Sequence, residues 1–378
     1  MPTLSRLIVP ALAAILAAGT ALADEFSTDR VKIKVDVVAS GLKFPWAVEV
    51  LPDGAYLVTE RAGRLRIVRD GRLLDPIDGV PEVAARGQGG LLDVALSPDF
   101  AEDRTIYMTA ALAYGGGSGT GVIKARLSAD ERSLTDVETI FRMKKTGRTN
   151  RHFGARIAFG TDGTLYFAIG DRGDMKRGQD FMDHAASIIR INTDGSVPDD
   201  NPFADGRNAL PEIFSKGHRN AQGLVFDPVT SGMITAEHGA KGGDEINLPK
   251  AGLNYGWATI TYGKNYNGRK IGAGSDAPGL EQPAFYWDPS IAPGALVVYR
   301  GKMFPEWKDD VIITSLKFGL LSRLERDGDG RVGEEERFLK KDYGRLRDIV
   351  VAPDGALLVT TDSPEGRILR ISRAGDAS

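Results

Sequence analysis

One unit recurs along the chain: a short alternating apolar strand, a turn rich in Pro, Asp and Gly, and a second β-rich strand. Asp-Gly between alternating strands is a strong hairpin signal, because glycine accepts the positive φ that a tight hairpin turn requires. The five first strands are Ala47–Leu51, Asp93–Leu96, Arg156–Phe159, Gly223–Phe226 and Asp348–Val351. Their partner strands are Ala55–Thr59, Thr105–Thr109, Leu165–Ile169, Met233–Glu237 and Ala356–Thr360. Such repetition is typical of a β-propeller.

We therefore predict an all-β fold in which residues 24–378 form one domain, a six-bladed β-propeller with four-stranded antiparallel blades. Each blade would use roughly 60 residues, with the surplus over common repeats in loops. A β-sandwich would not need five similar hairpins. Helical periodicity is confined to Met182–Ile189.

The first 23 residues have the features of an export signal. Arg6 precedes the apolar, alanine-rich run Leu7–Ala23, which ends in the small-x-small pattern that signal peptidase cuts. The alternative is a retained membrane anchor, but the run is short and contains Pro10 and Gly19. We expect a signal peptide over 1–23 and a periplasmic or secreted protein after cleavage near Ala23.

The charge and cysteine content exclude several classes of function. The formal net charge is −3, which argues against nucleic acid or an acidic membrane surface as the partner. The chain has no cysteine. Disulfides, zinc–thiolate sites, iron–sulfur clusters and a cysteine nucleophile are therefore excluded.

The first candidate site combines residues from both ends of one predicted hairpin. His152 lies just before the strand that begins at Arg156, and Asp171 follows the paired strand that ends at Ile169. Both hairpin ends lie at one edge, so the carboxylate can reach the imidazole. A carboxylate that fixes the tautomer and raises the basicity of a histidine suits a general base near pH 7. The alternative is two solvated loop residues.

Three further clusters are polar. Gly217–Gly223 places polar side chains just before a predicted strand, and Glu237–Glu245 combines glycines, which leave backbone carbonyls free, with acidic residues. Mixed hard oxygen ligands of that kind suit calcium rather than zinc. The third cluster contains Lys317 and the pair Arg345 and Arg347, which would share one strand face. With Arg219, these cations would form a pocket for several carboxylates, unless they belong to a solvated surface strand.

Two apparent motifs are better explained otherwise. Gly115–Gly121 is glycine-rich, but no helical pattern follows it, so it is not a dinucleotide-binding loop. Glu325–Glu336 resembles a calcium-binding helix–loop–helix, but its flanks look like strands. A hairpin turn is the better interpretation of the second segment.

Taken in order, these clusters resemble the soluble quinoprotein sugar dehydrogenases, most closely their compact aldose sugar dehydrogenase branch. The resemblance runs from Phe44 to Arg370. Its most specific motifs are Gly87–Leu91, His152 with Gly154–Arg156, Ile169–Asp171, Gly217–Asn220, Gly243–Asn247, Asn254–Trp257 and Arg345–Asp348. The family fold is a six-bladed propeller, in agreement with the repeats.

The resemblance implies roles for individual residues. His152 would be the proton acceptor, Asp171 its orienting carboxylate, and Arg219 a third member of the catalytic set. The residues that would bind pyrroloquinoline quinone are Gln88, Arg219, Asn220, Tyr266, Lys317, Arg345 and Arg347, with Trp287 flanking the pocket. The residues that would bind Ca²⁺ are Gly239 and Ala240 at the quinone, and Glu245 and Tyr255 at a second site.

The implied function is oxidation of aldose sugars at the anomeric carbon to lactones, with hydride transfer to the quinone and an external electron acceptor. The resemblance also implies a monomer or weak dimer that is not inserted in a membrane. Two other classes are weighed on the residues themselves. A metal-dependent propeller lactonase or hydrolase would not need four cationic residues around one pocket. In a non-catalytic sugar-binding propeller, pairing of His152 with Asp171 would have no purpose.

The chain departs from the larger glucose dehydrogenases of this family at two positions. His238 stands where they have an amide, and Arg151 precedes the base where they have an acidic residue. The chain also lacks their long insertions. These departures favour a wide cleft with broad sugar specificity.

Overall fold

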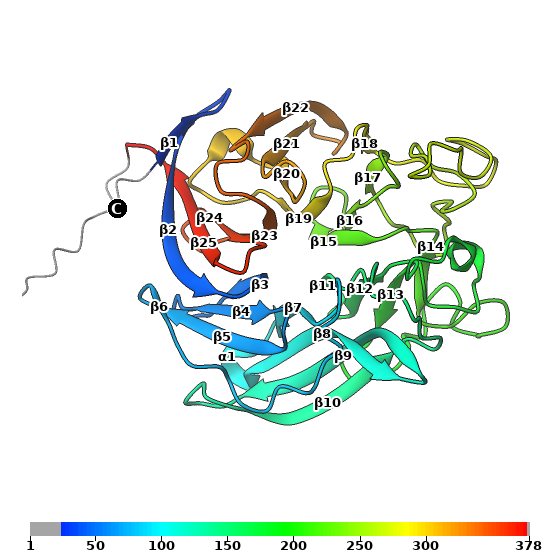
Figure 1. The fold of residues 1–378 in the computed structure, drawn as a ribbon, viewed down its shortest axis with the longest axis horizontal. Coiled ribbons are helices and arrows are strands. Elements are labelled where there is room, and N and C mark those ends of the chain that lie inside the picture. Colours follow the sequence, from blue (N-terminus) through cyan, green and yellow to red (C-terminus); the bar gives the residue numbers. More distant parts are fainter. Residues whose placement is uncertain (1–23, 376–378) are drawn as a thin grey trace, which may run out of the picture.

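Six antiparallel sheets are arranged radially around a central axis (Figure 1). They are seen in a computed structural model that describes residues 24–375. The predicted signal peptide, 1–23, lies outside the described residues. The predicted six-bladed β-propeller is confirmed. In each blade, the first strand of the inner hairpin lies beside the axis.

From the axis outward, the first three blades are β3 (Pro45–Val50), β4 (Tyr56–Glu60), β5 (Arg64–Arg69) and β6 (Arg72–Leu73); β7 (Leu91–Leu96), β8 (Thr105–Tyr114), β9 (Gly117–Leu127) and β10 (Leu134–Arg142); and β11 (Ile157–Phe159), β12 (Leu165–Ile169), β13 (Ser187–Ile191) and β14 (Ile213–Lys216). The other three are β15 (Ala221–Asp227), β16 (Gly232–Glu237), β17 (Asp244–Asn247) and β18 (Phe285–Trp287); β19 (Pro293–Val298), β20 (Val311–Ser315), β21 (Leu321–Arg326) and β22 (Val332–Phe338); and β23 (Leu346–Val351), β24 (Leu357–Thr361), β25 (Gly366–Arg373), β2 (Lys32–Leu42) and β1 (Asp24–Ser27). The helices are α1 (Phe100–Asp103) and the 3₁₀ helices η1 (Met175–Gln179) and η2 (Pro305–Trp307).

The five predicted hairpins are the two innermost strands of five blades. For example, Val48 of β3 pairs with Val58 of β4, and Ile349 of β23 pairs with Val359 of β24. The sixth hairpin, β19–β20, is missing from the predicted repeat. Its connection contains η2 in place of an Asp-Gly turn, so the local turn signal is absent from the sequence.

The last blade closes the ring, because it combines strands from both ends of the chain. Strand β2 pairs with β25, with Val35 opposite Ile371 and Val37 opposite Leu369. Figure 1 shows the blue β2 beside the red C-terminal strands. Backbone hydrogen bonds within this one blade thus hold the two ends of the chain together and close the ring.

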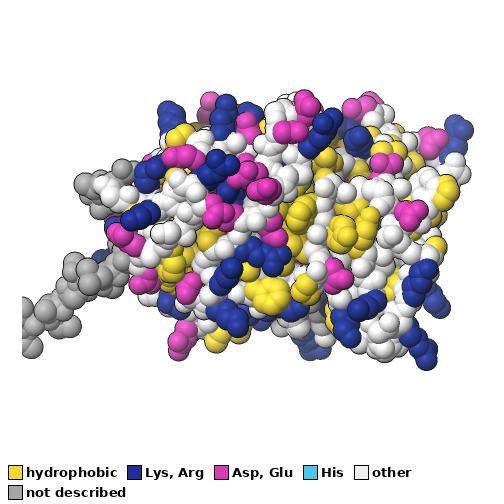
Figure 2. All heavy atoms as spheres, turned by 90° about the horizontal axis from the view of Figure 1, so that it is seen from above, with side chains coloured by type: hydrophobic (Ala, Val, Ile, Leu, Met, Phe, Trp, Pro, Cys, Tyr) yellow, Lys and Arg dark blue, Asp and Glu magenta, His cyan; other side chains and the backbone are white. Residues whose placement is uncertain are grey.

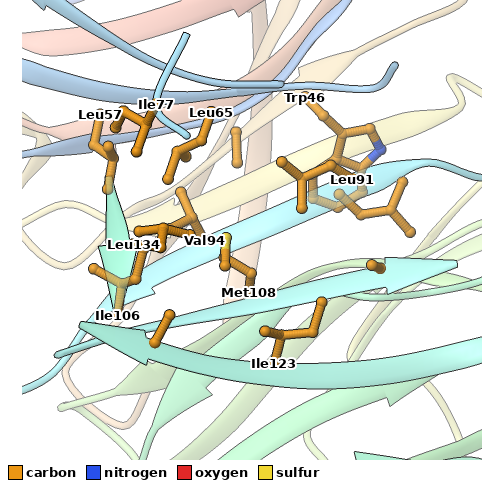
Figure 3. Packing of buried hydrophobic residues seen from close by; sticks show 14 of the residues in the cluster. Trp46, Leu57, Leu65, Ile77, Leu91, Val94, Ile106, Met108, Ile123 and Leu134 are labelled. Atoms are coloured by element: carbon orange, nitrogen blue, oxygen red, sulfur yellow. The ribbon is translucent and has the colours of Figure 1, made fainter. Parts of the chain in front are cut away.

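Apolar side chains fill the space between neighbouring blades. In Figure 3, Leu57 and Leu65 from the first blade meet Val94, Ile106 and Met108 from the second. Each such side chain, when fully buried, stabilises the fold by about 1.5–3 kcal/mol. Packing of this kind fixes the angle between blades, and with it the relative positions of the loops at their ends.

A buried arginine links three blades beside the axis. Nη1 of Arg156 lies 2.9 Å from Oδ1 of Asp93 and 2.7 Å from Oδ1 of Asp348, on the inner strands β7 and β23. Its Nε donates to the carbonyl oxygen of Gln222, on β15, at 3.1 Å. These contacts pair opposite charges away from water and hold the inner strands together, although Nη2 of Arg156 has no hydrogen-bond partner within residues 24–375.

Three local predictions are decided by the structure. The helix expected over Met182–Ile189 is wrong: these residues form turns followed by β13, where Ile188 and Ile189 are buried on both faces of the sheet. A strand that is buried on both faces and a buried helix segment can both be encoded by a continuous apolar run, so the sequence pattern alone does not distinguish them. The glycine-rich segment Gly115–Gly121 lies at the β8–β9 hairpin, and Glu325–Glu336 contains the β21–β22 turn, both as expected.

Charges of both signs are intermingled over the face seen in Figure 2, with apolar side chains between them. This face carries no extended area of one sign. No helix in the described part of the chain is long and apolar enough to cross a membrane.

Candidate active site

The candidate residues lie at one end of the propeller because of how its hairpins run. His152 lies five residues before the inner strand β11 and Asn220 directly before β15, whereas Asp171 and His238 follow the partner strands β12 and β16. The start of an inner strand and the end of its partner lie at the same edge, opposite the hairpin turn. Gln88, before β7, lies at that edge too.

His152 and Asp171 form a hydrogen-bonded pair. Nδ1 of His152 lies 2.6 Å from Oδ1 of Asp171, and the aspartate side chain is only 2% exposed. The carboxylate can only accept here, which places the proton on Nδ1 and leaves Nε2 with its lone pair. The imidazole remains 12% exposed, so a small molecule can reach it.

The surroundings of the pair favour the protonation states that His152 needs to act as a base. Burial lowers the pKa of His152 below its ordinary value of 6.5, against the opposing effect of the hydrogen bond that the imidazole donates to Asp171. Burial alone would raise the pKa of Asp171, but the hydrogen bond to His152 and the charges of His152 and Arg219 hold it below its ordinary range. At pH 7 the imidazole is therefore neutral and the carboxylate ionised.

The backbone that carries His152 is held in a costly conformation. His152 has φ 55° and Arg172, beside Asp171, also has φ 55°, a left-handed region that costs non-glycine residues about 1 kcal/mol or more. The amide of His152 donates to Oε1 of Gln88 at 2.7 Å. On the other side, Arg172 donates to the carbonyl oxygens of Arg151 and Thr149 and its guanidinium stacks on Phe153.

Close packing between the two loops explains the glycines in these motifs. A Cβ on Gly154, which has φ +67°, would lie 2.7 Å from the carbonyl oxygen of Ala168. A Cβ on Gly170 would collide with the carbonyl oxygen of His152. Glycine at both positions lets the histidine loop lie directly on the aspartate loop.

A cavity of about 310 Å³ opens beside the base. His152, Asp171 and Arg219 line it, together with Gln88 and Tyr266. Tyr266 stands at the rim, with 73% of its surface exposed. The structure therefore brings these five predicted residues together around one solvent-accessible space.

A second cavity, of about 250 Å³, lies nearer the axis and shares Gln88 with the first. It is rich in cations: Arg61, Arg345 and Arg347 line it, against one carboxylate, Asp362. Oδ2 of Asp362 accepts from Arg345 at 3.0 Å and from Arg347 at 3.1 Å, so both arginines face one space, as predicted.

Two arginine nitrogens in this region are buried and unsatisfied. Nε of Arg347 and Nε of Arg219 have no hydrogen-bond partner within residues 24–375. A buried cationic donor without an acceptor is costly. Arg219 lines the first cavity and Arg347 the second, so the guanidinium groups of both residues lie where an anionic ligand could bind.

The sequence profile of the family described as "Glucose / Sorbosone dehydrogenase" matches residues 42–370. The chain belongs to this family. It is 40% identical over 345 residues to the aldose sugar dehydrogenase YliI of Escherichia coli K12, covering 90% of this chain and 93% of that protein. Membership of this family identifies the chain as a sugar dehydrogenase.

Two solved structures from this class have the same fold. The apo-form of the soluble aldose sugar dehydrogenase from Escherichia coli superposes with a TM-score of 0.87 at 40% identity, covering 90% of this chain and 99% of that chain. The PQQ-bound aldose sugar dehydrogenase from Streptomyces coelicolor superposes with a TM-score of 0.74 at 28% identity, covering 92% and 100%. The second structure is of a quinone-bound protein.

The predicted metal ligands are divided between two cavities that Arg219 lines. Gly239, Glu245 and Tyr255 line a third, small cavity with Arg219, and Ala240 lines the cavity of the base. Burial, with the charges of Glu237 and Asp244, raises the pKa of Glu245 to about 8. Within residues 24–375, no three His, Asp or Glu side chains are grouped to hold a metal ion.

Two predicted residues are not brought to these cavities. The side chain of Lys317 is exposed, with its ammonium 4.8 Å from the centre of the Phe318 ring. Trp287 is 2% exposed and packs in the apolar cluster between two blades, where its Nε1 donates to Glu335 at 2.9 Å. Its alternation on β18 turns it away from the site.

Sequence reasoning did not assign roles to several residues that shape the site. Asp362, which joins the two arginines, follows β24 just as Asp171 follows β12, so its position in the repeat was an available signal. Gln222 accepts from Nη1 of Arg347 at 3.0 Å. The guanidinium carbons of Arg156 and Arg347 lie 4.4 and 5.7 Å from the centre of the Trp46 ring. No local motif predicts these long-range contacts.

Proposed function

We propose that this chain oxidises aldose sugars at the anomeric carbon to lactones, with pyrroloquinoline quinone as the resident hydride acceptor. The observation that carries the proposal is the His152–Asp171 pair in an open cavity that adjoins a cationic one through Gln88. The family assignment and the quinone-bound relative support it. A lactonase or a non-catalytic sugar-binding propeller would have no need for a cavity with a base next to a cavity lined by cations.

The residues present fit the quinone. It carries three carboxylates, and Arg347 and Arg219 each have a buried nitrogen that lacks an acceptor. We propose that Gln88, Asn220 and Tyr266 complete its site with Arg219, Arg345 and Arg347. When bound, the quinone would accept the hydride that leaves the anomeric carbon.

The protein's own part in the reaction is to orient the sugar and move a proton. Nε2 of His152 would take the proton of the anomeric hydroxyl while the hydride departs, so the sugar loses two electrons and two hydrogens and becomes a lactone. Asp171 holds the imidazole and stabilises the imidazolium that forms. Arg219, lining the same cavity, would stabilise negative charge as it develops.

We further propose calcium at two positions. Its ligands would be the carbonyls of Gly239 and Ala240 beside the quinone, and Glu245 with the backbone of Tyr255 at a second site. These are the hard oxygen donors that calcium prefers. Glu245 lies beside two further carboxylates, Glu237 and Asp244, so a metal ion would offset the negative charge gathered there. Calcium would act as a Lewis acid on the bound quinone.

Chelation is expected to abolish activity and to lower the melting temperature by several degrees, because an ion that binds only the folded state stabilises it. Calorimetry and aldose oxidation, measured before and after readdition of calcium, check this. Glu245→Gln, which removes one charge at the second site alone, should lose most of the calcium-dependent stabilisation of that site. A metal-free sample, verified by elemental analysis, that still oxidises aldoses with quinone would refute the calcium proposal.

The pH dependence follows from the lowered pKa of His152. Only the neutral imidazole can accept the proton, so kcat/KM should rise with pH through a kinetic pKa below 6.5 and level off above it. A pH profile measured with saturating quinone and calcium checks this. An acid limb centred at or above 6.5 would contradict the assignment of His152 as a base buried in this environment.

We also propose that the chain is exported to the periplasm or secreted, works as a monomer or weak dimer, and passes electrons to an external acceptor. The proposed function itself is tested by reconstitution. Quinone and calcium are added to purified protein, and the absorption band of the bound quinone is followed as an aldose is added. Loss of that band on sugar addition would support the proposed dehydrogenase activity. A band that no aldose alters would refute it.

A further inference from the structure

The carboxylate of Asp171 is held at both oxygens, by different parts of the chain. Oδ1 accepts from His152 at 2.6 Å and from the backbone amide of Gly173 at 2.7 Å. Oδ2 accepts from Nε1 of Trp257 at 2.8 Å, the one hydrogen bond to that oxygen within residues 24–375. Trp257 is 86 residues away in sequence, so this contact exists only in the folded propeller.

Trp257 is itself rigidly placed. It is 4% exposed and packs in an apolar cluster with Ala186, Ala240 and Ile271. Its backbone amide donates to the carbonyl oxygen of Gly217 at 3.0 Å, and its carbonyl accepts from Nε2 of Gln179 at 2.7 Å. An indole fixed in this way can impose an orientation on the carboxylate rather than follow it.

The same indole also faces the cation of the site. The guanidinium carbon of Arg219 lies 5.2 Å from the centre of the Trp257 ring, within range of a cation–π contact. Trp257 therefore contacts both charged neighbours of the base. It is neutral, so it does not compete with His152 for the negative charge of Asp171 as a lysine or arginine would.

We infer that Trp257 is a positioning residue for the base: its indole N–H fixes the plane of the Asp171 carboxylate, and thereby sets the tautomer and the basicity of His152. Without that donor Oδ2 loses its one partner among residues 24–375, and the carboxylate plane is held only through the contacts of Oδ1 with His152 and Gly173. Its consequence for catalysis rests on the proposed function, but its consequence for the imidazole does not.

The direction of the effect can be worked out from the charges that face His152. These are Asp171, which raises its pKa, and Arg219 and Arg151, which lower it. Trp257→Phe changes none of these charges. It removes a donor that partly neutralises the carboxylate, so Asp171 should stabilise the imidazolium more strongly and the pKa of His152 should rise by roughly half a unit.

The chain has four histidines, so ring-labelled protein gives few NMR signals to assign. The test uses Trp257→Phe without quinone or metal, which keeps an aromatic ring in the cluster and removes the indole N–H together with part of the ring. We expect the raised pKa of His152 and a new population protonated at Nε2, with His184 unchanged. Tyr343→Phe is the matched control, because it deletes a donor to a carboxylate, that of Asp24, at a mostly buried ring outside the three cavities.

In the reconstituted enzyme, Trp257→Phe should lower kcat roughly ten- to a hundred-fold with KM for sugar nearly unchanged, because the base is misplaced rather than removed. Tyr343→Phe should leave kcat within about two-fold. A pKa and tautomer of His152 equal to wild type in Trp257→Phe would overturn the inference. If the wild type oxidises no aldose, the proposed function fails, yet the NMR result still decides the role of Trp257.

Discussion

Replacing His152 with alanine is expected to lower turnover by roughly two to four orders of magnitude, the usual contribution of a positioned base. The affinity for quinone and calcium should remain close to wild type. The neutral imidazole supplies neither a positive charge for the quinone carboxylates nor an oxygen ligand for calcium. Steady-state kinetics on fully loaded protein measures this. It is the larger of the two strongest effects that the site geometry predicts.

The matched control is His184→Gln. His184 also pairs with a carboxylate, Glu212, at 3.1 Å, but it lies outside both cavities. Its replacement should leave turnover per folded molecule within about two-fold. If His152→Ala turned over at the wild-type rate with full cofactor occupancy, His152 would have no part in the mechanism.

Truncating Arg347 to alanine should cost about 2–5 kcal/mol of quinone affinity, because a carboxylate of the ligand loses its partner in a water-poor cavity. Arg345→Ala should act in the same direction but less strongly, since its side chain is 53% exposed and that of Arg347 only 10%. Equilibrium titration of quinone into the apo variants measures both.

Two further variants separate this effect from general charge loss. Asp362→Asn removes the negative charge that accepts hydrogen bonds from both Arg345 and Arg347, so it should preserve or strengthen quinone binding. Arg300→Ala removes an exposed arginine paired with Asp309 and should change the affinity by less than about 0.5 kcal/mol. Wild-type affinity in both Arg345→Ala and Arg347→Ala would contradict the proposed quinone site.

Local signals in the sequence predicted most of the fold. The hairpins around Asp53-Gly54 and Asp354-Gly355 were predictable because a tight turn and two alternating strands are properties of adjacent residues. The β19–β20 hairpin was not, because its connection buries Trp307 in a 3₁₀ helix and carries no turn motif. The segment Met182–Ile189 was misassigned because periodicity cannot separate a buried strand from a short helix.

The same distinction applies to the site. The pairing of His152 with Asp171 followed from the two ends of one hairpin, and the shared face of Arg345 and Arg347 followed from the period of a strand. Trp257 and Asp362 act through contacts between blades, which are set by how sheets pack around the axis. Trp287 illustrates the converse, because a family resemblance gives a position in the chain but not the direction of the side chain.

The central claim, oxidation at the anomeric carbon by the protein-bound quinone, is tested most directly by a single turnover without an external electron acceptor. Protein loaded with quinone and calcium is mixed anaerobically with an aldose, and the quinone band and the sugar product are measured together. We predict one lactone formed for each quinone reduced, and slower reduction when the anomeric carbon carries deuterium. Lactone formed while the quinone stays oxidised, or no sugar oxidised by the fully loaded protein, would contradict the account.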